Sequence, residues 1–300
     1  MSLSIAHRGP DGEGAVMLPG GNGDMMVGLA HRRLAIIDVS ALGRQPMRVA
    51  CARCGSDSRS ELLLIYNGEL YNFRDLRRAL EAKGHRFHSA TDSEVLLHLY
   101  AEHGTAMLEQ LEGIFAFAIF DGRESGRPPG VQRGDLFIAR DQLGVKPLYH
   151  TTTSDGFLFA SELKALLQHE PLARTLNPVA LHQHLALLWT PAPQTLLKEV
   201  FKLQPGHALL VRDGSIAREW CYYDLPYGRE PMRGSEADIA RELHALIVRA
   251  VGRQLISDVP VGAFLSGGLD SSAVVAMMRR AQPERDITCY CIGFAGDDAV

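Results

Sequence analysis

Short apolar runs separated by polar turns fill most of the first three quarters of the chain. Runs of four to seven residues rich in aromatic and branched side chains are typical of strands, and Asn67-Gly68 and Asp121-Gly122 follow two of them as turn signals. Asp213-Gly214 lies between two further runs, which is the pattern of a β-hairpin. We therefore predict strands at residues 62–66, 114–120, 136–139, 157–160, 208–212 and 216–220.

Three other segments repeat apolar residues at intervals of three and four, which is helical spacing. They are residues 74–83, residues 92–103 and residues 178–189, and the third is stopped by Pro191 and Pro193. Groups of strands interrupted by separate helices are typical of α+β domains built in layers. The first part of the chain therefore predicts such a domain.

A polar tract at residues 226–236 separates this pattern from a different one. Residues 239–255 are amphipathic, and apolar runs at 259–265 and 287–294 flank another helical segment. The order helix, strand, helix, strand indicates a parallel α/β sheet. We therefore predict two domains, residues 1–225 and residues 236–300, with the polar tract as their linker.

The sequence Ser-Gly-Gly-Leu-Asp-Ser-Ser, at residues 266–272, lies between the predicted buried strand and the helix after it. Gly267 and Gly268 let a backbone come close to a ligand, and we expect Asp270 and the two serines after it to cap the helix. Free N–H groups at such a helix start bind anions, phosphate among them. The spacing and the lysine of a Walker loop are missing, so we predict a phosphate site of another kind.

Composition narrows the functions that the chain can have. The net charge is −4, and no long basic run points to nucleic acid or to an anionic membrane. No apolar stretch approaches the roughly 18 residues that cross a bilayer, and residues 1–8 do not resemble a signal peptide. We therefore expect a cytoplasmic protein whose five cysteines are reduced.

Cys51 and Cys54 have the spacing of zinc ligands, but a four-ligand site needs two more side chains. Cys289 and Cys291 do not supply them, because their spacing is wrong and they lie in a predicted strand. We therefore predict no metal-ligand set among the residues, and interpret residues 51–60 as a polar excursion of a hairpin.

Four polar motifs mark the predicted first domain. Each has a simple structural interpretation on its own, such as a hairpin turn for Asn67-Gly68 and a helix cap for Asp92. The motifs are HRGPDG at residues 7–12, AHRRLAIID at 30–38, NGELYN at 67–72 and TDSE at 91–94. In this order, ahead of residues 266–272, they resemble the asparagine synthetase family of class II glutamine amidotransferases, as do residues 140–149 and 160–166.

The resemblance implies a fold and a glutamine pocket. The first domain would be an α+β N-terminal-nucleophile hydrolase-like sandwich of the αββα kind, followed by the start of an α/β parallel-sheet ATP-pyrophosphatase domain. In the sandwich, Arg33 would clamp the α-carboxylate of glutamine and Asp92 would bind its α-ammonium group. Asn67 and the Gly68 N–H would form the oxyanion hole. The other pocket residues would be Glu69 and the backbone of Arg33, Leu34, Ala35, Ile36 and Ile37.

The resemblance also implies that the second domain cleaves ATP to AMP and pyrophosphate. Asp270 would help to hold Mg²⁺ beside the pyrophosphate, and Leu265 and Ile292 would contact the nucleoside at the ends of two parallel strands. The residues implied in ATP binding are Leu265, Ser266, Gly267, Gly268, Asp270, Ser271, Ser272 and Ile292.

The nucleophile of the family is a cysteine directly after the initiator methionine, and this chain has Ser2 there. Only four residues separate Ser2 from His7, where the family places roughly 25 to 30, so Ser2 is not expected to replace the cysteine. We expect the chain to be a fragment that lacks the cysteine segment and most of the synthetase domain. As printed, it is not expected to hydrolyse glutamine.

The parent enzyme is then expected to make asparagine from aspartate, ATP and glutamine, with AMP, pyrophosphate and glutamate as the other products. One alternative is ATP-dependent amidation of another carboxylate, in a sugar acid, a peptide or a secondary metabolite. Another is a catalytically inactive amidotransferase module. The expected partners are small molecules, neither nucleic acid nor membrane is expected, and a homodimer stays open.

Overall fold

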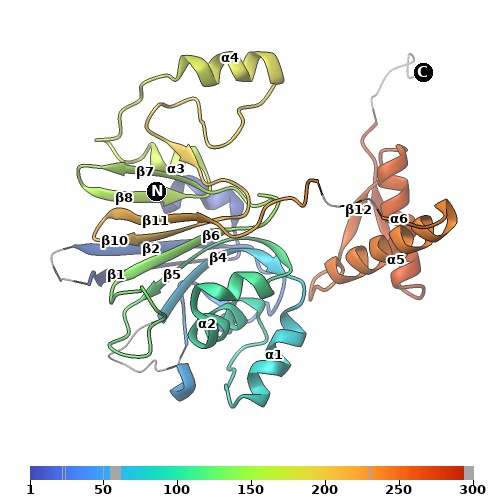
Figure 1. Cartoon of the computed structure of the whole chain (residues 1–300), viewed down its shortest axis with the longest axis horizontal. Coiled ribbons are helices and arrows are strands. Elements are labelled where there is room, and N and C mark those ends of the chain that lie inside the picture. Colours follow the sequence, from blue (N-terminus) through green and yellow to red (C-terminus); the bar gives the residue numbers. More distant parts are fainter. Residues whose placement is uncertain are drawn as a thin grey trace. The chain divides into compact units, whose positions relative to one another are not determined.

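The computed structural model describes residues 1–21, 23, 25–49, 51–54, 62–228, 230 and 232–293. The chain divides into two compact units, Met1–Leu225 and Pro226–Val300 (Figure 1). Across the described residues, no helix has the length and apolar character needed to cross a membrane.

A six-stranded sheet organises the first unit, and all of its neighbouring strands are antiparallel. Its central strand β5 pairs along its length with β4 and along most of it with β6. The strands, in their order across the sheet, are β11 (Ser215–Cys221), β10 (His207–Arg212), β6 (Asp135–Arg140), β5 (Gly113–Asp121), β4 (Leu62–Leu70) and β3 (Met47–Arg48).

Two smaller sheets lie against one face of this sheet (Figure 1). One is the antiparallel pair β1 (Gly12–Pro19) and β2 (Met26–Arg33), and the other has the order β8 (Gly156–Ala160), β7 (Tyr149–Thr153), β9 (Phe201–Lys202). One apolar cluster fills the space between the layers. Its members come from all three sheets and include Leu29, Ala118, Ile138, Leu203 and Leu209.

Helices cover the outer faces of these sheets. Tyr100 of α2 (Asp92–His103) stacks on Phe137 of β6, with ring centroids 5.7 Å apart, and α1 (Phe73–Ala82) packs beside α2. The 3-10 helix Ser2–Arg8 contacts β2 and α3 (Leu163–Leu166). The first unit also contains α4 (Pro178–Leu187), which ends where Leu188 turns left-handed, and the 3-10 helix Gly104–Gln110 after α2.

Most predicted elements of the first unit are present, but the predicted turn at Asn67-Gly68 is wrong. Both residues lie inside β4, because Gly68 pairs with Phe115 and the β4–β5 ladder continues to Leu70. The predicted hairpin at Asp213-Gly214 is confirmed, and both residues have the positive φ of a type I′ turn. Residues 55–61 of the predicted polar excursion lie outside the described residues.

The second unit contains α5 (Glu236–Gln254), β12 (Gly262–Phe264), α6 (Leu269–Ala281) and β13 (Thr288–Tyr290). The two strands are parallel, as predicted, and α5 packs against α6. The expectation of a buried strand over residues 259–265 is wrong: β12 has three residues and leaves Phe264 76% exposed. In the described residues β12 pairs with β13 alone. The parallel sheet of the second unit therefore has two strands there, and its faces are incompletely covered.

Candidate functional site

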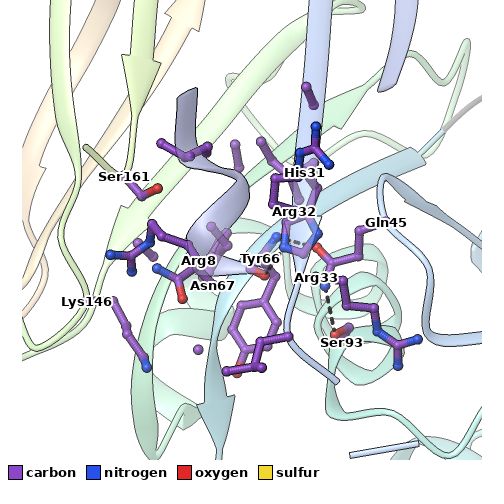
Figure 2. Close-up of a pocket in the computed structure, with 18 of the residues that line it drawn as sticks. Arg8, His31, Arg32, Arg33, Gln45, Tyr66, Asn67, Ser93, Lys146 and Ser161 are labelled. Carbon is purple, nitrogen blue, oxygen red and sulfur yellow. Dashed lines mark hydrogen bonds between the residues drawn. The ribbon is translucent and has the colours of Figure 1, made fainter. Parts of the chain in front are cut away.

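A cavity of about 340 Å³ lies in the first unit, beside the ends of β2 and β4 and the start of α2 (Figure 2). Eight residues predicted to bind glutamine line it. They are Arg33, Leu34, Ile36, Ile37, Asn67, Gly68, Glu69 and Asp92. The ninth, Ala35, is not among the lining residues; its N–H donates to Asp11 at 2.9 Å. The structure thus brings together segments that lie up to 59 positions apart in the sequence, from Arg33 to Asp92.

The edge of β4 that faces away from β5 supplies backbone donors to this region. β3 covers only Leu63 and Leu64 of that edge. Alternate residues of a strand direct their N–H groups to the same side, so the N–H groups of Tyr66, Gly68 and Leu70 all point away from β5. Gln45 accepts from the Tyr66 N–H at 2.6 Å, and Asp92 accepts from the Leu70 N–H at 2.9 Å. The Gly68 N–H between them is left for a ligand.

Asn67 and Gly68 therefore present two donors side by side. The Asn67 Nδ2 is buried and has no hydrogen-bond partner among the described residues. Gly68 must be glycine, because a Cβ there would lie 2.3 Å from the Ile114 carbonyl oxygen and 2.8 Å from Phe115 Cα. An unpartnered amide group next to an outward-facing backbone N–H is the kind of donor pair that an oxyanion needs.

The Arg33 guanidinium is held by backbone carbonyl groups. It donates to Ser40 O at 2.7 Å and also to Asp38 O. Gly43 leaves room for it, since a Cβ at that position would lie 2.0 Å from Arg33 Nη2. A guanidinium fixed in this way lines the cavity as a rigid donor fork for a carboxylate.

Asp92 is 5% exposed and begins α2. Its Oδ2 accepts from the Tyr66 hydroxyl and the Leu70 N–H, both at 2.9 Å. Burial raises the pKa of this carboxyl, while those two hydrogen bonds act in the opposite direction. The alternative reading of Asp92 as the helix cap is wrong, because Thr91 is the N-cap and accepts from the Glu94 N–H at 3.2 Å.

Glu69 and Lys146 bring opposite charges to the same cavity. Burial raises the pKa of Glu69, and the charge of Lys146 acts against that increase. Lys146 comes from a loop held by the buried carboxylate of Asp141, which accepts from the N–H groups of Val145 at 2.9 Å and Lys146 at 3.0 Å. Arg140 donates to the Lys146 carbonyl at 2.7 Å. The polar side chains of Arg140 and Asp141 thus hold the backbone of this loop in place.

His31, Tyr66, Gln45 and Lys146 also line the cavity, and the sequence reasoning gave them no role. His31 Nε2 donates to the Tyr66 carbonyl at 3.0 Å, and burial lowers the pKa of His31 to about 4. The neutral ring then leaves Nδ1 bare, and this buried nitrogen has no partner among the described residues. His31 lies within the AHRRLAIID motif and Lys146 within residues 140–149, and the resemblance of those segments was the available signal; Gln45 and Tyr66 gave none.

The HRGPDG motif reaches this cavity through Arg8, which is one of the lining residues. His7 Nε2 and Arg8 Nη1 bind the same oxygen of Glu162, at 2.9 and 3.1 Å, which connects residues 7–12 to residues 160–166. Hydrogen bonds from Lys164, His7 and Arg8 outweigh desolvation and lower the pKa of Glu162 to about 2. Ser2 also lines the cavity, and its hydroxyl accepts from Arg32 Nε at 3.2 Å.

The loop of the second unit holds the residues predicted to bind ATP. Ser271 Oγ lies 3.1 Å from Ser266 Oγ and accepts from the Ser266 N–H at 3.3 Å, which closes the loop on itself. Gly267 has φ of +81°, a conformation that favours glycine. The expectation that Asp270 and the serines cap the helix is wrong: Gly268 is the N-cap, so Asp270, Ser271 and Ser272 lie in the first turn of α6.

Leu265 and Ile292 leave the sheet at the same edge. Phe264 pairs with Tyr290 at the carboxyl ends of the parallel strands, and the Leu265 N–H donates to Tyr290 O at 2.8 Å. Ile292 follows two residues later and is 80% exposed. Ligands of open parallel sheets bind at this edge, next to the start of the following helix.

Comparison with known proteins defines the class of the chain. Residues 1–223 match the family model of a glutamine amidotransferase domain, and residues 242–300 match the model of asparagine synthase. The chain therefore belongs to the glutamine amidotransferases. With the two matches in this order, it belongs to the asparagine synthetase (glutamine-hydrolysing) family.

Curated relatives agree with this assignment. The chain is 40% identical over 278 residues to asparagine synthetase [glutamine-hydrolyzing] 3 of Bacillus subtilis, covering 92% of this chain and 41% of the relative. It is 35% identical to putative asparagine synthetase [glutamine-hydrolyzing] 2 of Methanocaldococcus jannaschii, covering 99% and 56%. Amidase chry2 of Gibberella zeae is 32% identical, covering 91% and 37%. The chain thus spans about half the length of these relatives or less.

The fold is also found in solved structures. The glutamine phosphoribosylpyrophosphate amidotransferase of Bacillus subtilis, complexed with ADP and GMP, matches with a TM-score of 0.50 and 17% identity. The match covers 96% of this chain and 61% of that one. Together with the domain match, it confirms the predicted N-terminal-nucleophile hydrolase-like sandwich.

Proposed function

We propose that the chain is the glutamine-binding part and the start of the synthetase part of a glutamine-dependent asparagine synthetase. The observation that carries the proposal is the cavity of the first unit. Its lining includes the Arg33 guanidinium, the buried Asp92, the backbone of Gly68 and Asn67, whose Nδ2 has no partner among the described residues. One end of an amino acid and one carbonyl oxygen would be recognised there.

In the proposed complex, Arg33 binds the α-carboxylate of glutamine and Asp92 accepts from its α-ammonium group. The side-chain carbonyl oxygen points at Asn67 Nδ2 and the Gly68 N–H. These donors gain most when the oxygen becomes an anion in the tetrahedral intermediate, so they favour attack on the amide carbon. Glu69 and Lys146 hold the polar wall of the pocket.

No cysteine lines the cavity among the described residues, and Cys51 and Cys54 are buried elsewhere in the unit. For the chain as printed, we therefore propose glutamine binding without hydrolysis. In the parent enzyme a cysteine thiolate would attack the amide carbon, ammonia would leave, and water would release glutamate.

In the second unit, ATP would lie over residues 265–272, with its phosphates at the N-terminus of α6 and Mg²⁺ near Asp270. The aspartate side-chain carboxylate would attack the α-phosphorus and release pyrophosphate. Ammonia would then displace AMP from the acyl adenylate to give asparagine. The support for this half is the strand, glycine loop and helix geometry together with the family match. We place the reaction in the cytoplasm.

Calorimetry of the chain with L-glutamine tests the first half. We expect binding that is reduced about 10- to 100-fold in Arg33→Lys, which loses the fork, and in Asp92→Asn, which keeps the shape but loses the charge. Arg78→Lys and Asp75→Asn change an exposed ion pair of α1 and are the matched controls. Equal binding by all five proteins, or none by the unchanged chain, would overturn the pocket assignment.

The acceptor is tested by exchange of labelled pyrophosphate into ATP, measured on the full-length protein with aspartate. Exchange that depends on aspartate supports asparagine synthesis. Exchange with another carboxylate but not with aspartate would favour amidation of a different acceptor, for which the likeness to an amidase is the supporting observation. Glutamine binding without any exchange would favour the inactive module.

A further inference from the structure

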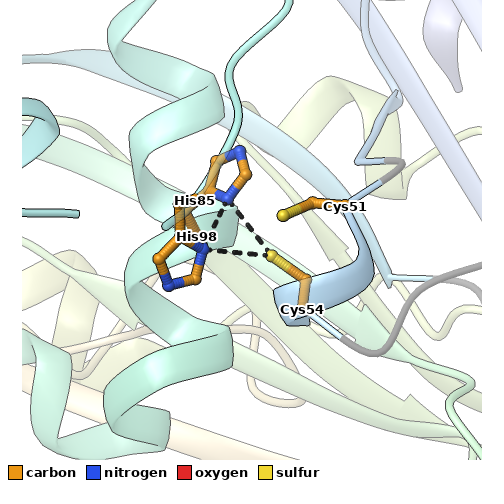
Figure 3. A group of neighbouring side chains, drawn as sticks. All are labelled: Cys51, Cys54, His85 and His98. Carbon is orange, nitrogen blue, oxygen red and sulfur yellow. Dashed lines mark hydrogen bonds between the residues drawn. The ribbon is translucent and has the colours of Figure 1, made fainter. Parts of the chain in front are cut away.

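Two cysteines and two histidines of the first unit converge on one point (Figure 3). Cys51 and Cys54 come from the segment before β4, where Cys54 ends the 3-10 helix Ala52–Cys54. His85 follows α1, and His98 lies in the middle of α2. One ligand atom from each of the four lies within 4.8 Å of all the others. The fold therefore supplies the two side chains that the Cys-x-x-Cys spacing lacked.

The distances between these atoms are the edges of a small tetrahedron. Cys54 Sγ lies 3.1 Å from His98 Nδ1 and 3.5 Å from His85 Nδ1, and the two Nδ1 atoms are 3.0 Å apart. Bonds of about 2.3 Å to sulfur and 2.05 Å to nitrogen, at tetrahedral angles, give sulfur–nitrogen edges of about 3.6 Å and nitrogen–nitrogen edges of about 3.3 Å. The three edges among Cys54, His85 and His98 reach these values after shifts of a few tenths of an ångström, and the Cys51 ligand atom lies within 4.8 Å of the other three.

The orientation of both rings also points to a cation. His85 Nε2 lies 3.2 Å from Glu102 Oε2, and His98 Nε2 lies 3.6 Å from Glu94 Oε1. A carboxylate only accepts hydrogen bonds, so the Nε2 of His85 donates to Glu102 and the Nδ1 of the same ring faces the cluster. The Nδ1 atoms of the two rings lie 3.0 Å apart and both face Cys54 Sγ, so three potential ligand atoms meet at one point. Carboxylates behind metal-binding histidines fix the ring tautomer in this way.

All four side chains are shielded from solvent. The exposed fractions are 5% for Cys51, 2% for Cys54, 3% for His85 and 0% for His98. The residue Arg123, itself buried, donates to the Cys54 carbonyl at 3.0 Å and so fixes the backbone of that segment. Four protein ligands in a closed, buried set are typical of structural metal sites, which keep no position open for substrate.

We propose that Cys51, Cys54, His85 and His98 bind a structural Zn²⁺ ion. Two thiolates and two neutral imidazoles are the donors that select zinc, and the two negative charges cancel that of the ion, which suits a buried site. Binding releases the two thiol protons to solvent. The ion fastens the segment before β4 to α2, the helix whose first residue, Asp92, lies in the cavity.

The test is the metal content of the reduced full chain, purified in the presence of Zn²⁺ and then freed of loosely bound metal. We expect about one zinc per chain by elemental analysis. Replacement by Co²⁺ should give the intense visible absorption of a tetrahedral site together with thiolate-to-cobalt charge transfer. Cys54→Ser and His98→Asn should each lower bound zinc at least tenfold.

The exposed cysteines provide the matched control, since Cys221, Cys289 and Cys291 can all be changed to serine without touching the site. That triple variant should keep its zinc and its cobalt spectrum. If the site variants fail to fold, chelation and re-addition of Zn²⁺ to the unchanged chain gives a second measurement. Both tryptophans, Trp189 and Trp220, lie in the first unit, so their fluorescence should report a lower unfolding midpoint of that unit without metal.

Three results would overturn the proposal. They are reduced chain without zinc, cobalt spectra without thiolate charge transfer, and zinc that disappears in the triple serine variant. A Cys51–Cys54 disulfide in protein isolated under reducing conditions would overturn it as well. None of these outcomes depends on glutamine or ATP, so the metal proposal and the proposed function fail separately.

Discussion

Asn67-Gly68 in β4 and Gly267-Gly268 before α6 both offer backbone N–H groups to a predicted anion, but their surroundings differ. Gly68 is pressed between β5 and Tyr66, so a single methyl group would collide with backbone atoms. Nothing lies within 4 Å of a Cβ built on Gly267. The first pair lies inside a strand and is defined by packing against Ile114, Phe115 and Tyr66. The second lies in a loop and is defined by its own dihedral angles and the hydroxyl of Ser271.

The two units thus orient a backbone N–H donor in two different ways. In the first unit, neighbours occupy every competing N–H, and desolvation strengthens the donors that remain. In the second unit, local conformation alone sets the direction of the N–H groups, and water competes for them. We expect substitutions in the first unit to act through packing and burial, and substitutions in the second to have small, local effects.

The largest expected effect is the loss of unfolding free energy when a buried ion pair is broken, compared with the loss when an exposed one is broken. Arg123 donates to Asp121 at 2.9 and 2.6 Å, and their side chains are 1% and 0% exposed. Arg123→Met should lower the free energy of unfolding of the first unit by about 3–5 kcal/mol, because Asp121 is left charged and buried. Tryptophan fluorescence in a urea titration measures it.

Arg241 pairs with Asp238 on the surface of α5 and is the control for that substitution. Arg241→Met should change the protection of the second unit against hydrogen exchange by less than about 0.5 kcal/mol. Equal losses for the two variants would contradict the contrast between the units.

A smaller effect is expected from a single methyl group at each glycine. Gly68→Ala forces β4 and β5 apart and should cost about 3 kcal/mol of unfolding free energy and abolish glutamine binding. Gly267→Ala meets no neighbour and should cost about 1 kcal/mol, from its left-handed conformation alone. Calorimetry with glutamine and denaturant titration test the first, and hydrogen exchange tests the second. A Gly68→Ala chain that binds glutamine normally would refute the close packing.

The third effect is a pH dependence confined to the first unit. The pKa of His31 is lowered to about 4 in the folded chain and is 6.5 in the unfolded chain. The stability that the neutral ring contributes is therefore fully present above pH 6.5 and is lost as the pH falls toward 4. Between pH 7 and pH 5 this costs about 2 kcal/mol of unfolding free energy. His31→Gln, whose amide can still donate to the Tyr66 carbonyl, should remove that part of the slope.

Burial also lowers the pKa of His150 to about 4, so His150→Gln should remove a similar part independently. The two residues lie in different sheets, His31 in β2 and His150 in β7, so the double variant should show the sum of both changes. A slope that stays unchanged in both single variants would count against the burial of these rings.

Element bounds were predicted best where apolar residues recur regularly along a helix or strand. The bounds of α2 agree with the prediction, Asp92 to His103, and β5 was placed within one residue at each end. β1 and β2 were missed because glycines interrupt the first and the second ends in His31, Arg32 and Arg33, which carry no apolar signal. Asn67-Gly68 has the local signal of a turn, and pairing with β5 overrides it.

The sequence could predict only those residues of the candidate sites that lie in recognisable motifs. Eight of the nine residues predicted to bind glutamine reach one cavity, because they belong to three short motifs that a resemblance could order. His85 and His98 lie 31 and 44 positions from Cys54, so no motif joins them to the cysteines. Only the packing of α1 and α2 beside β4 brings those side chains together.

The Gly68 N–H of β4 is distinguished from its neighbours only by contacts that other segments bring. Tyr66 and Leu70 lose their donors to Gln45 and Asp92, which arrive from the segment before β3 and from α2. Before these two segments dock, three equivalent N–H groups compete for any anion, and none is distinguished from the others. Selectivity at Gly68 therefore requires both segments to be docked. A ligand held there should slow the local opening of α2, because that opening would undo the selection.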